Sequence, residues 1–294
     1  MTVVGIDEVR DLVRMRATDP GRIKQLLAQR AMPQLWRSSE KRLMMVAADH
    51  PARGALGAGS DALAMANRVG LLDRLVRALA HSGVDGVLGT ADVIEDLLLL
   101  GALEGKVVIG SMNRGGIANT SFEIDDRFTG YSADAIAAAG LQGGKMLLRI
   151  DPEDLATPST LHACGAAVDD LARHGLMAMI EPFISRRANG RLANDLSVTE
   201  AIRAATIAAG LGSTSAYTWL KLPVVADMEA LLSSTTMPVL LLGGEVGPDQ
   251  AAQFDSWSAA LESPNVRGLV VGRSMLYPAD GDVESAVDAA VRML

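Results

Sequence analysis

The chain has 294 residues, 49% of them hydrophobic, which suffices for a sizeable core in one large domain or two ordinary ones. Its formal net charge is −8, and its basic residues are scattered rather than gathered into the stripe that nucleic-acid binding requires. No stretch of roughly 18 apolar residues is free of charge, so we expect no membrane span. The single cysteine, Cys164, leaves no internal disulfide to form, and we expect a cytoplasmic protein.

Two helical stretches open the chain, at residues 6–15 and 21–31. Eight short apolar runs follow, each of the kind that forms a buried parallel strand. These runs are residues 42–49, 85–90, 106–112, 144–150, 175–182, 217–224, 237–244 and 266–272. Amphipathic segments separate them, and two of these, at 65–83 and 196–212, end in glycine, a common helix stop.

Eight strand–helix alternations predict a (β/α)₈ TIM barrel of class α/β. We expect a single domain over residues 1–294, with residues 1–41 as a helical N-terminal extension that caps or flanks the barrel. An open doubly wound sheet is the alternative, but no GxGxxG motif follows the first run, which weakens a dinucleotide-binding version. The segments 111–132 and 185–197, after the third and fifth runs, are expected to be loops.

Side chains alternate between the two faces of a strand, so polar residues in an apolar run indicate which face lines the barrel axis. In the run 217–224, Lys221 lies opposite an apolar face. In the run 144–150, Lys145 and Arg149 do the same, and Asp49 and Glu181 stand near the ends of two further runs. Five charged residues should therefore meet near the axis at the active end of the barrel, where a purely structural ion-pair network is the alternative use.

A lysine in a low-dielectric pocket beside other cations loses its proton more readily, and the neutral amine attacks ketones to form a Schiff base. Glu181 or Asp49 would move the protons that such chemistry requires. Of the four histidines only His50 belongs near the active end, and one histidine with one aspartate is a weak metal signal. We therefore expect neither a metal nor a cofactor.

The last two runs end in glycines, where barrels frequently bind phosphate. Gly243 and Gly244 follow the seventh run, and Gly272 and Arg273 follow the eighth. Glycine lets backbone N–H groups approach an anion, and arginine pairs with it. A phosphorylated small molecule is therefore the expected substrate.

An ordered set of short motifs carries a family resemblance: VAADHP, GGKMLLRID, IEPF, WLKLPV, GG and VGRSM. From residue 43 onwards the chain resembles the class I aldolases that include the tagatose-1,6-bisphosphate, archaeal-type fructose-bisphosphate and deoxyribose-phosphate enzymes. The resemblance implies that Lys221 is the Schiff-base lysine and that Asp49, Lys145 and Glu181 are catalytic. It also implies that the four phosphate-site residues above hold the phosphate of a dihydroxyacetone-phosphate half, and that the protein is a homo-oligomer.

Arg149 departs from the pattern of this family, in which aromatic residues stand near this position. Its guanidinium would suit a carboxylate or a second phosphate, so we expect a substrate-binding role and a phosphorylated ketose or keto-sugar acid. The 6-phosphate of 2-deoxy-5-keto-gluconate, from inositol catabolism, fits this expectation. The alternatives are a thiolase-like acyl transferase on the same barrel and a non-catalytic sugar-phosphate-binding barrel.

Overall fold

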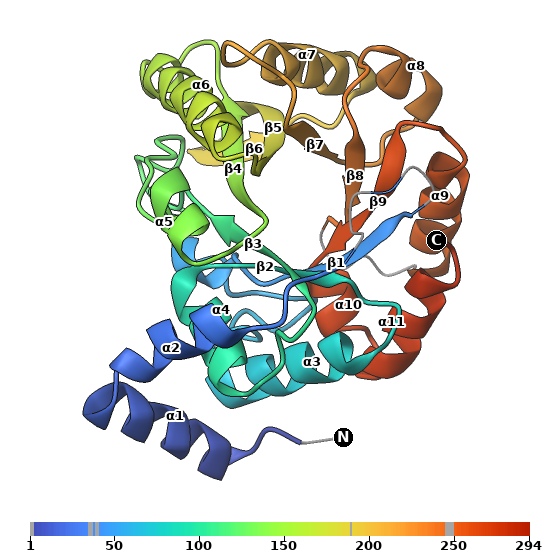
Figure 1. Ribbon diagram of the computed structural model, residues 1–294. Helices are drawn as coiled ribbons and strands as arrows, with labels where there is room; N and C mark the ends of the chain where they lie inside the picture. Colours follow the sequence, from blue (N-terminus) through green and yellow to red (C-terminus); the bar gives the residue numbers. More distant parts are fainter. Residues whose placement is uncertain (1–2, 35–37, 39–40, 189, 245–249) are drawn as a thin grey trace.

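The computed structural model describes residues 3–34, 38, 41–188, 190–244 and 250–294. Within them nine strands form one sheet, eight of which run parallel and close into a barrel (Figure 1). The barrel strands are β1 (Leu43–Ala47), β2 (Gly86–Gly89), β3 (Val107–Ser111), β4 (Gly143–Ile150), β5 (Met177–Ala188), β7 (Thr218–Leu222), β8 (Val239–Leu242) and β9 (Val266–Val271). The predicted TIM barrel is confirmed, and all eight predicted runs are its strands.

Helices alternate with the strands and form the outer ring (Figure 1). They are α3 (Arg68–Ala80), α4 (Ala91–Leu99), α5 (Ala133–Ala138), α6 (Ala156–Arg173), α7 (Val198–Ala209), α8 (Met228–Ser233), α9 (Gln250–Leu261), α10 (Arg273–Leu276) and α11 (Val283–Val291). Asn67 accepts a hydrogen bond from the Gly70 N–H and so caps the start of α3.

Two apolar layers result from the alternation of side chains along the strands. The outward layer packs against the helices and includes Met44, Met146 and Leu220, as predicted. The inward layer fills the barrel with residues such as Met45, Met179 and Leu240. The lower part of the barrel is therefore dry, which raises the energetic importance of any charge placed above it.

The N-terminal helices α1 (Ile6–Thr18) and α2 (Gly21–Gln29) lie outside the ring, beside α3 and α4 (Figure 1). Arg16 of α1 forms ion pairs with Glu95 and Asp96 of α4 at 2.9 Å. Arg30, only 4% exposed, donates to the carbonyls of Lys106 and Gly140. These charged contacts dock the extension on the flank of the barrel, as the sequence predicts.

The segment after β5 is a β-hairpin rather than the predicted loop. β5 continues past the barrel and pairs antiparallel with β6 (Arg191–Asn194) from Ser185 to Ala188. The sequence here is mostly polar, so it lacks the apolar run by which the other strands were predicted. The hairpin rises above the carboxyl end of the barrel, and Leu192, Ala193 and Asn194 line the cavity there.

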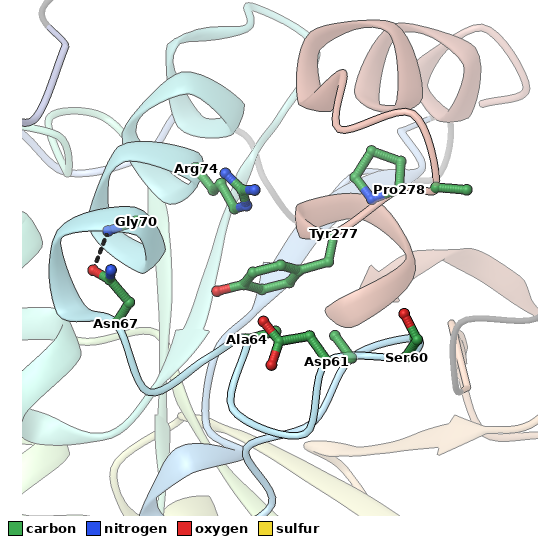
Figure 2. Close-up of a pocket in the computed structure, with 11 residues that line it drawn as sticks. Ser60, Asp61, Ala64, Asn67, Gly70, Arg74, Tyr277 and Pro278 are labelled. Atoms are coloured by element: carbon green, nitrogen blue, oxygen red, sulfur yellow. Dashed lines mark hydrogen bonds between the residues drawn. The ribbon is translucent and has the colours of Figure 1, made fainter.

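A second cavity, of about 730 Å³, lies between the β1–α3 segment and the end of α10 (Figure 2). The Arg74 guanidinium stacks over the Tyr277 ring at 4.9 Å from its centroid, and this contact joins α3 to α10. Burial raises the pKa of Tyr277 to about 12. Among the residues that the structure describes, this outer cavity shares none of its lining with the cavity at the barrel axis.

Candidate active site

A cavity of about 810 Å³ opens at the carboxyl ends of the barrel strands. All nine predicted site residues line it, and they come from six strands and the segments that follow them. They are Asp49, Lys145, Arg149, Glu181, Lys221, Gly243, Gly244, Gly272 and Arg273. The structure thus brings the predicted residues together at the end of the barrel where such enzymes hold their sites.

Strand register places the charged side chains in two layers. Lys145 pairs across the sheet with Met179, which in turn pairs with Trp219. Glu181 and Lys221 each follow that level by two residues, so their side chains lie one layer higher. The Lys145 ammonium reaches up from the lower layer and contacts Glu181.

Four charged side chains, Asp49, Lys145, Glu181 and Lys221, form what we call the axial cluster. Lys221 Nζ donates to Glu181 Oε1 at 2.8 Å, and the other Glu181 oxygen pairs with Lys145. Lys145 Nζ also donates to Asp49 Oδ2 at 3.1 Å. The charges alternate in sign along this chain of contacts, so each cation bears on a carboxylate.

Two residues of the β3 end complete the surroundings of Asp49. Ser111 Oγ donates to Asp49 Oδ2 at 3.1 Å, and Arg114 Nη1 lies 3.2 Å from the same oxygen. Ser111 was missed at the sequence level, although it shares the inward face of β3 with Ile109 and its alternation would have revealed it. Arg114 stands outside any periodic element, so no pattern of alternation identifies it.

Burial and neighbouring charges shift the pKa values of the axial cluster. Burial lowers the pKa of Lys145 to about 8, and the nearby Arg114 charge acts in the same direction. Burial alone would raise the pKa of Asp49, but Arg114 and Lys145 outweigh it and hold that pKa well below the usual range. Lys145 and Lys221 likewise overcome the burial of Glu181 and lower its pKa far below the ordinary value.

His50 follows Asp49 and lines the same cavity. Burial lowers the pKa of His50 to about 3, so its ring is neutral at physiological pH despite Asp49 Oδ1 at 3.9 Å. Within the described residues no group of three or more His, Cys, Asp or Glu side chains is arranged to hold a metal ion.

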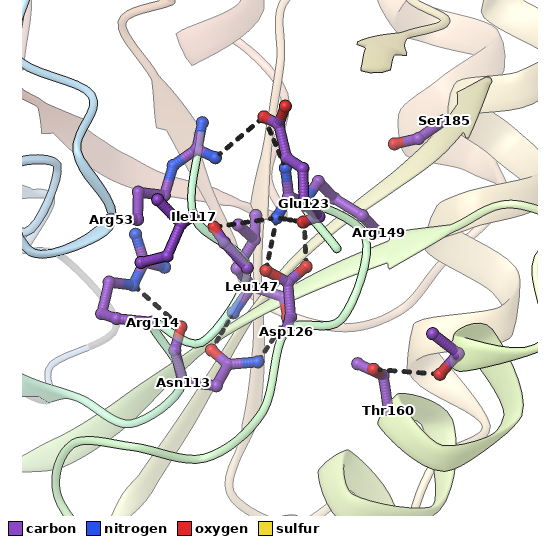
Figure 3. A network of polar contacts seen from close by, with 12 residues as sticks. Arg53, Asn113, Arg114, Ile117, Glu123, Asp126, Leu147, Arg149, Thr160 and Ser185 are labelled. Carbon is purple, nitrogen blue, oxygen red and sulfur yellow. Dashed lines mark hydrogen bonds and ion pairs between the residues drawn. The ribbon is translucent and has the colours of Figure 1, made fainter. Parts of the chain in front are cut away.

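Arg149 is held by the segment between β3 and α5 (Figure 3). Its Nε donates to Asp126 Oδ2 at 2.8 Å and its Nη2 donates to Asp126 Oδ1 at 2.5 Å. Nη1 pairs with Glu123 at 3.2 Å, and Nη2 also donates to the Glu123 carbonyl. Most of the guanidinium donors are therefore occupied by the protein, and the substrate-binding role predicted for Arg149 stays a prediction.

Asn113 fixes the start of the same segment by imitating a strand. Its side-chain amide donates to the Leu147 carbonyl at 2.6 Å and accepts from the Leu147 N–H at 2.7 Å (Figure 3). This pair of bonds continues the β3–β4 ladder by one step beyond the last paired residues. The position of Arg114, the next residue, is thereby fixed relative to β4.

The predicted phosphate residues lie together at the ends of β8 and β9. A Cβ atom on Gly272 would lie 2.7 Å from the Ala47 carbonyl and 2.8 Å from His50 Cε1, so only glycine fits between β9 and β1 here. Arg273 begins α10, and its Nη1 approaches the Gly57 carbonyl at 3.5 Å. Gln253 of α9 donates to the Gly243 carbonyl and holds the facing segment.

No helix in the described part of the chain combines the length and apolarity needed to cross a membrane.

The fold resembles that of class I aldolases of known structure. A Schiff-base-forming fructose-1,6-bisphosphate aldolase superposes with a TM-score of 0.63 at 17% identity, covering 92% of this chain and 99% of that one. An archaeal fructose 1,6-bisphosphate aldolase gives a TM-score of 0.65, also at 17% identity, covering 92% of this chain and 98% of that one. At this identity the likeness establishes a shared fold and no more.

The chain belongs to the Cgl0159-like family, whose profile matches residues 41–291. It is 50% identical to Cgl0159 from Corynebacterium glutamicum (Brevibacterium flavum), whose crystal structure superposes with a TM-score of 0.96 over 100% of this chain and 98% of that one. Comparison with curated proteins gives no match.

Proposed function

We propose that this protein is a class I aldolase in which Lys221 forms a Schiff base with the ketone of a phosphorylated ketose or keto-sugar acid. The observation that carries the proposal is the arrangement of two inward lysines on one glutamate, with Lys221 Nζ 2.8 Å from Glu181, above a dry barrel. A buried cluster of this kind is costly to stability and is typical of a functional site.

The reaction starts when the neutral Lys221 amine attacks the ketone carbon. Glu181 lies within hydrogen-bond reach to hold the proton that the Lys221 ammonium gives up before the attack. That proton and one proton from the attacking nitrogen then pass to the ketone oxygen, so that water leaves and a protonated imine remains. The bond between the α and β carbons of the imine then breaks. Its electron pair moves toward the imine nitrogen and gives an enamine. The hydroxyl proton of the departing carbon goes to a carboxylate of the axial cluster as the aldehyde forms.

The enamine is then protonated on carbon, and water hydrolyses the imine to release the donor half. Lys145 remains beside both carboxylates throughout, where its charge stabilises them between proton transfers. Dihydroxyacetone phosphate is the proposed donor half, with its phosphate on the glycines and Arg273 at the ends of β8 and β9.

Reductive trapping tests this proposal. The protein is incubated with dihydroxyacetone phosphate and borohydride, and peptide mass mapping locates the reduced adduct. We expect the adduct on Lys221, its loss in Lys221→Met, and its retention in Lys24→Met, which removes an exposed lysine. An adduct on Lys145 would move the nucleophile to β4, and no adduct with any ketose phosphate would refute an aldolase of this class.

Cleavage assays then address the substrate. The candidates are fructose 1,6-bisphosphate, tagatose 1,6-bisphosphate and 2-deoxy-5-keto-gluconate 6-phosphate. Turnover of the sugar acid supports the keto-acid version of the proposal, whereas turnover confined to the bisphosphates discards it.

A further inference from the structure

Arg114 places a buried nitrogen without a partner at the cavity wall. Its Nε donates to the Asn113 carbonyl at 2.8 Å, and Nη1 pairs with Asp49 at 3.2 Å. Nη2 is buried and has no hydrogen-bond partner among the described residues, in a side chain that is only 5% exposed and lines the cavity. Leaving a buried charged donor unpaired is costly, which indicates that a ligand completes it.

The cavity carries an excess of positive charge in a protein of net charge −8. Its described lining holds six basic side chains and three acidic ones: Arg53, Arg114, Lys145, Arg149, Lys221 and Arg273 against Asp49, Glu123 and Glu181. Asp126, which pairs with Arg149 outside this lining, offsets one of these charges, so two positive charges remain in excess. This excess favours an anionic ligand in the cavity.

The basic residues divide between opposite sides of the barrel. Around the barrel the strands follow the order β1, β2, β3, β4, β5, β7, β8, β9, so β8 and β9 face β3 and β4 across the axis. Gly272 and Arg273 lie at the end of β9, on the β8–β9 side, which we call the first side. Arg114 lies after β3, on the β3–β4 side, which we call the second side. Lys221, on β7, has the glycines of β8 on one side and Glu181 of β5 on the other.

Arg53 joins Arg114 on the second side. It ends a short 3₁₀ helix (Pro51–Arg53) after β1 and lies close to Arg114 in Figure 3. Its guanidinium contacts Glu123 at 3.4 Å, and burial together with the charges of Arg149 and Arg114 lowers its pKa. Three guanidinium groups therefore crowd one side of the cavity, and each contacts a carboxylate, but Arg114 Nη2 has no hydrogen-bond partner among the described residues.

We propose that Arg114, assisted by Arg53, forms a second anion subsite across the barrel from the phosphate residues, and that the enzyme takes substrates with an anionic group at each end. This inference rests on the proposed function, because it names the substrate class of the same site. The recognised group is a carboxylate or a phosphate, since both offer paired oxygens to a guanidinium.

Binding of unreactive six-carbon ligands tests the subsite without turnover. Calorimetric titration compares mannitol 1-phosphate, which has one anionic end, with mannitol 1,6-bisphosphate and 6-phosphogluconate, which have two. We expect the wild-type protein to bind at least one two-ended ligand about 10- to 100-fold more tightly than mannitol 1-phosphate, the range of one charged hydrogen bond. The better of the two identifies the second group as phosphate or carboxylate.

Arg114→Met should abolish most of that preference while affecting mannitol 1-phosphate far less. Arg127→Met is the matched control, because Arg127 lies in the same segment, pairs with Asp125 and has a side chain that is 79% exposed. Arg114→Lys keeps a cation beside Asp49 without the second nitrogen, so it should keep the melting temperature and still lose preference. It therefore covers the case in which the methionine variant is unstable.

Three results would overturn the inference. They are equal wild-type affinity for all three ligands, an equal loss for all three ligands in the Arg114 variants, and an Arg127→Met variant that behaves like Arg114→Met. Trapping of dihydroxyacetone phosphate on the wild-type protein is scored separately. Failed trapping with intact two-ended preference removes the aldolase proposal alone, whereas successful trapping without the preference removes the subsite alone.

Discussion

Replacing Arg149 by methionine tests whether its guanidinium stabilises the fold by holding Asp126 and Glu123 or binds the substrate. The side chain is 3% exposed and holds Asp126, itself 1% exposed, through two hydrogen bonds, together with Glu123. Removing one partner of a buried ion pair costs about 3–5 kcal/mol, because the other charge stays buried and unpaired. With an unfolding entropy of roughly 2.1 cal/mol/K per residue, that loss lowers the melting temperature of a chain this long by about 5–8 °C.

Urea denaturation followed by circular dichroism measures the change. The double variant Arg149→Met with Asp126→Asn should recover part of the stability, because the unpaired carboxylate is removed, and the cycle should show coupling of about 2 kcal/mol. A stability loss below about 1 kcal/mol, together with weaker binding of two-ended ligands, would refute this reasoning. Arg149 would then be the substrate-binding residue that the sequence suggested.

Three further outcomes follow from the geometry. Gly268→Ala should lower the melting temperature by at least about 5 °C or prevent folding, because φ is +134° and a Cβ would lie 2.0 Å from the Leu43 carbonyl at the β9–β1 junction. Gly59→Ala is the control, because Gly59 has a φ of +57° and open space around the added Cβ. Equal losses of melting temperature in the two variants would show that the clash at Gly268 is not the cause. The pKa values of Asp49 and Glu181 lie below the ordinary 3.8 and 4.5, because neighbouring cations outweigh burial. Stability to urea should therefore be full above about pH 4.5 and fall steadily below it. A flat stability profile from pH 5 to 2.5 would contradict the ion pairing of these carboxylates. Because burial lowers the pKa of Lys145 to about 8, its ammonium is lost above that pH and kcat/KM should decline there, whereas a profile that keeps rising to pH 10 would exclude a need for the charged form.

Alternation along the strands predicted the barrel and the direction of its inward charges. Met146 and Leu148 face the helices and Lys145 faces the axis because a buried strand reverses the side of each successive residue, a local property that a sequence displays. The distances between the side chains of the axial cluster could not be predicted from the sequence. The four residues of the cluster were nevertheless predicted, because alternation along the strands points their side chains toward the barrel axis.

Contacts made by the β3–α5 segment escaped prediction because they are distant in sequence and follow no period. Asp126 and Glu123 lie 23 and 26 positions before Arg149, in a stretch without regular structure. No pattern in the sequence indicates that these two acidic residues meet Arg149. The sequence therefore suggested a guanidinium that is free to bind a ligand. Arg114 likewise owes its position to Asn113, whose side chain imitates backbone pairing.

The hairpin after β5 was missed for a different reason. Both of its strands are polar and lie above the barrel, so they bury no apolar face that alternation would reveal. One local signal was nevertheless present, because Asn189 followed by Gly190 is among the strongest short-range indications of a hairpin turn.

The part of the β5–β6 hairpin that lines the cavity also affects which ligands the cavity excludes. Leu192 and Ala193 contribute apolar carbon to the wall of the cavity, from a hairpin that extends beyond the barrel portion of β5. Since the wall grows out of β5, the strand that carries Glu181, shortening or lengthening it leaves the reacting centre in place. Under the proposed function, relatives with altered hairpins would differ in the size of aldehyde they admit while keeping the same bond-making chemistry.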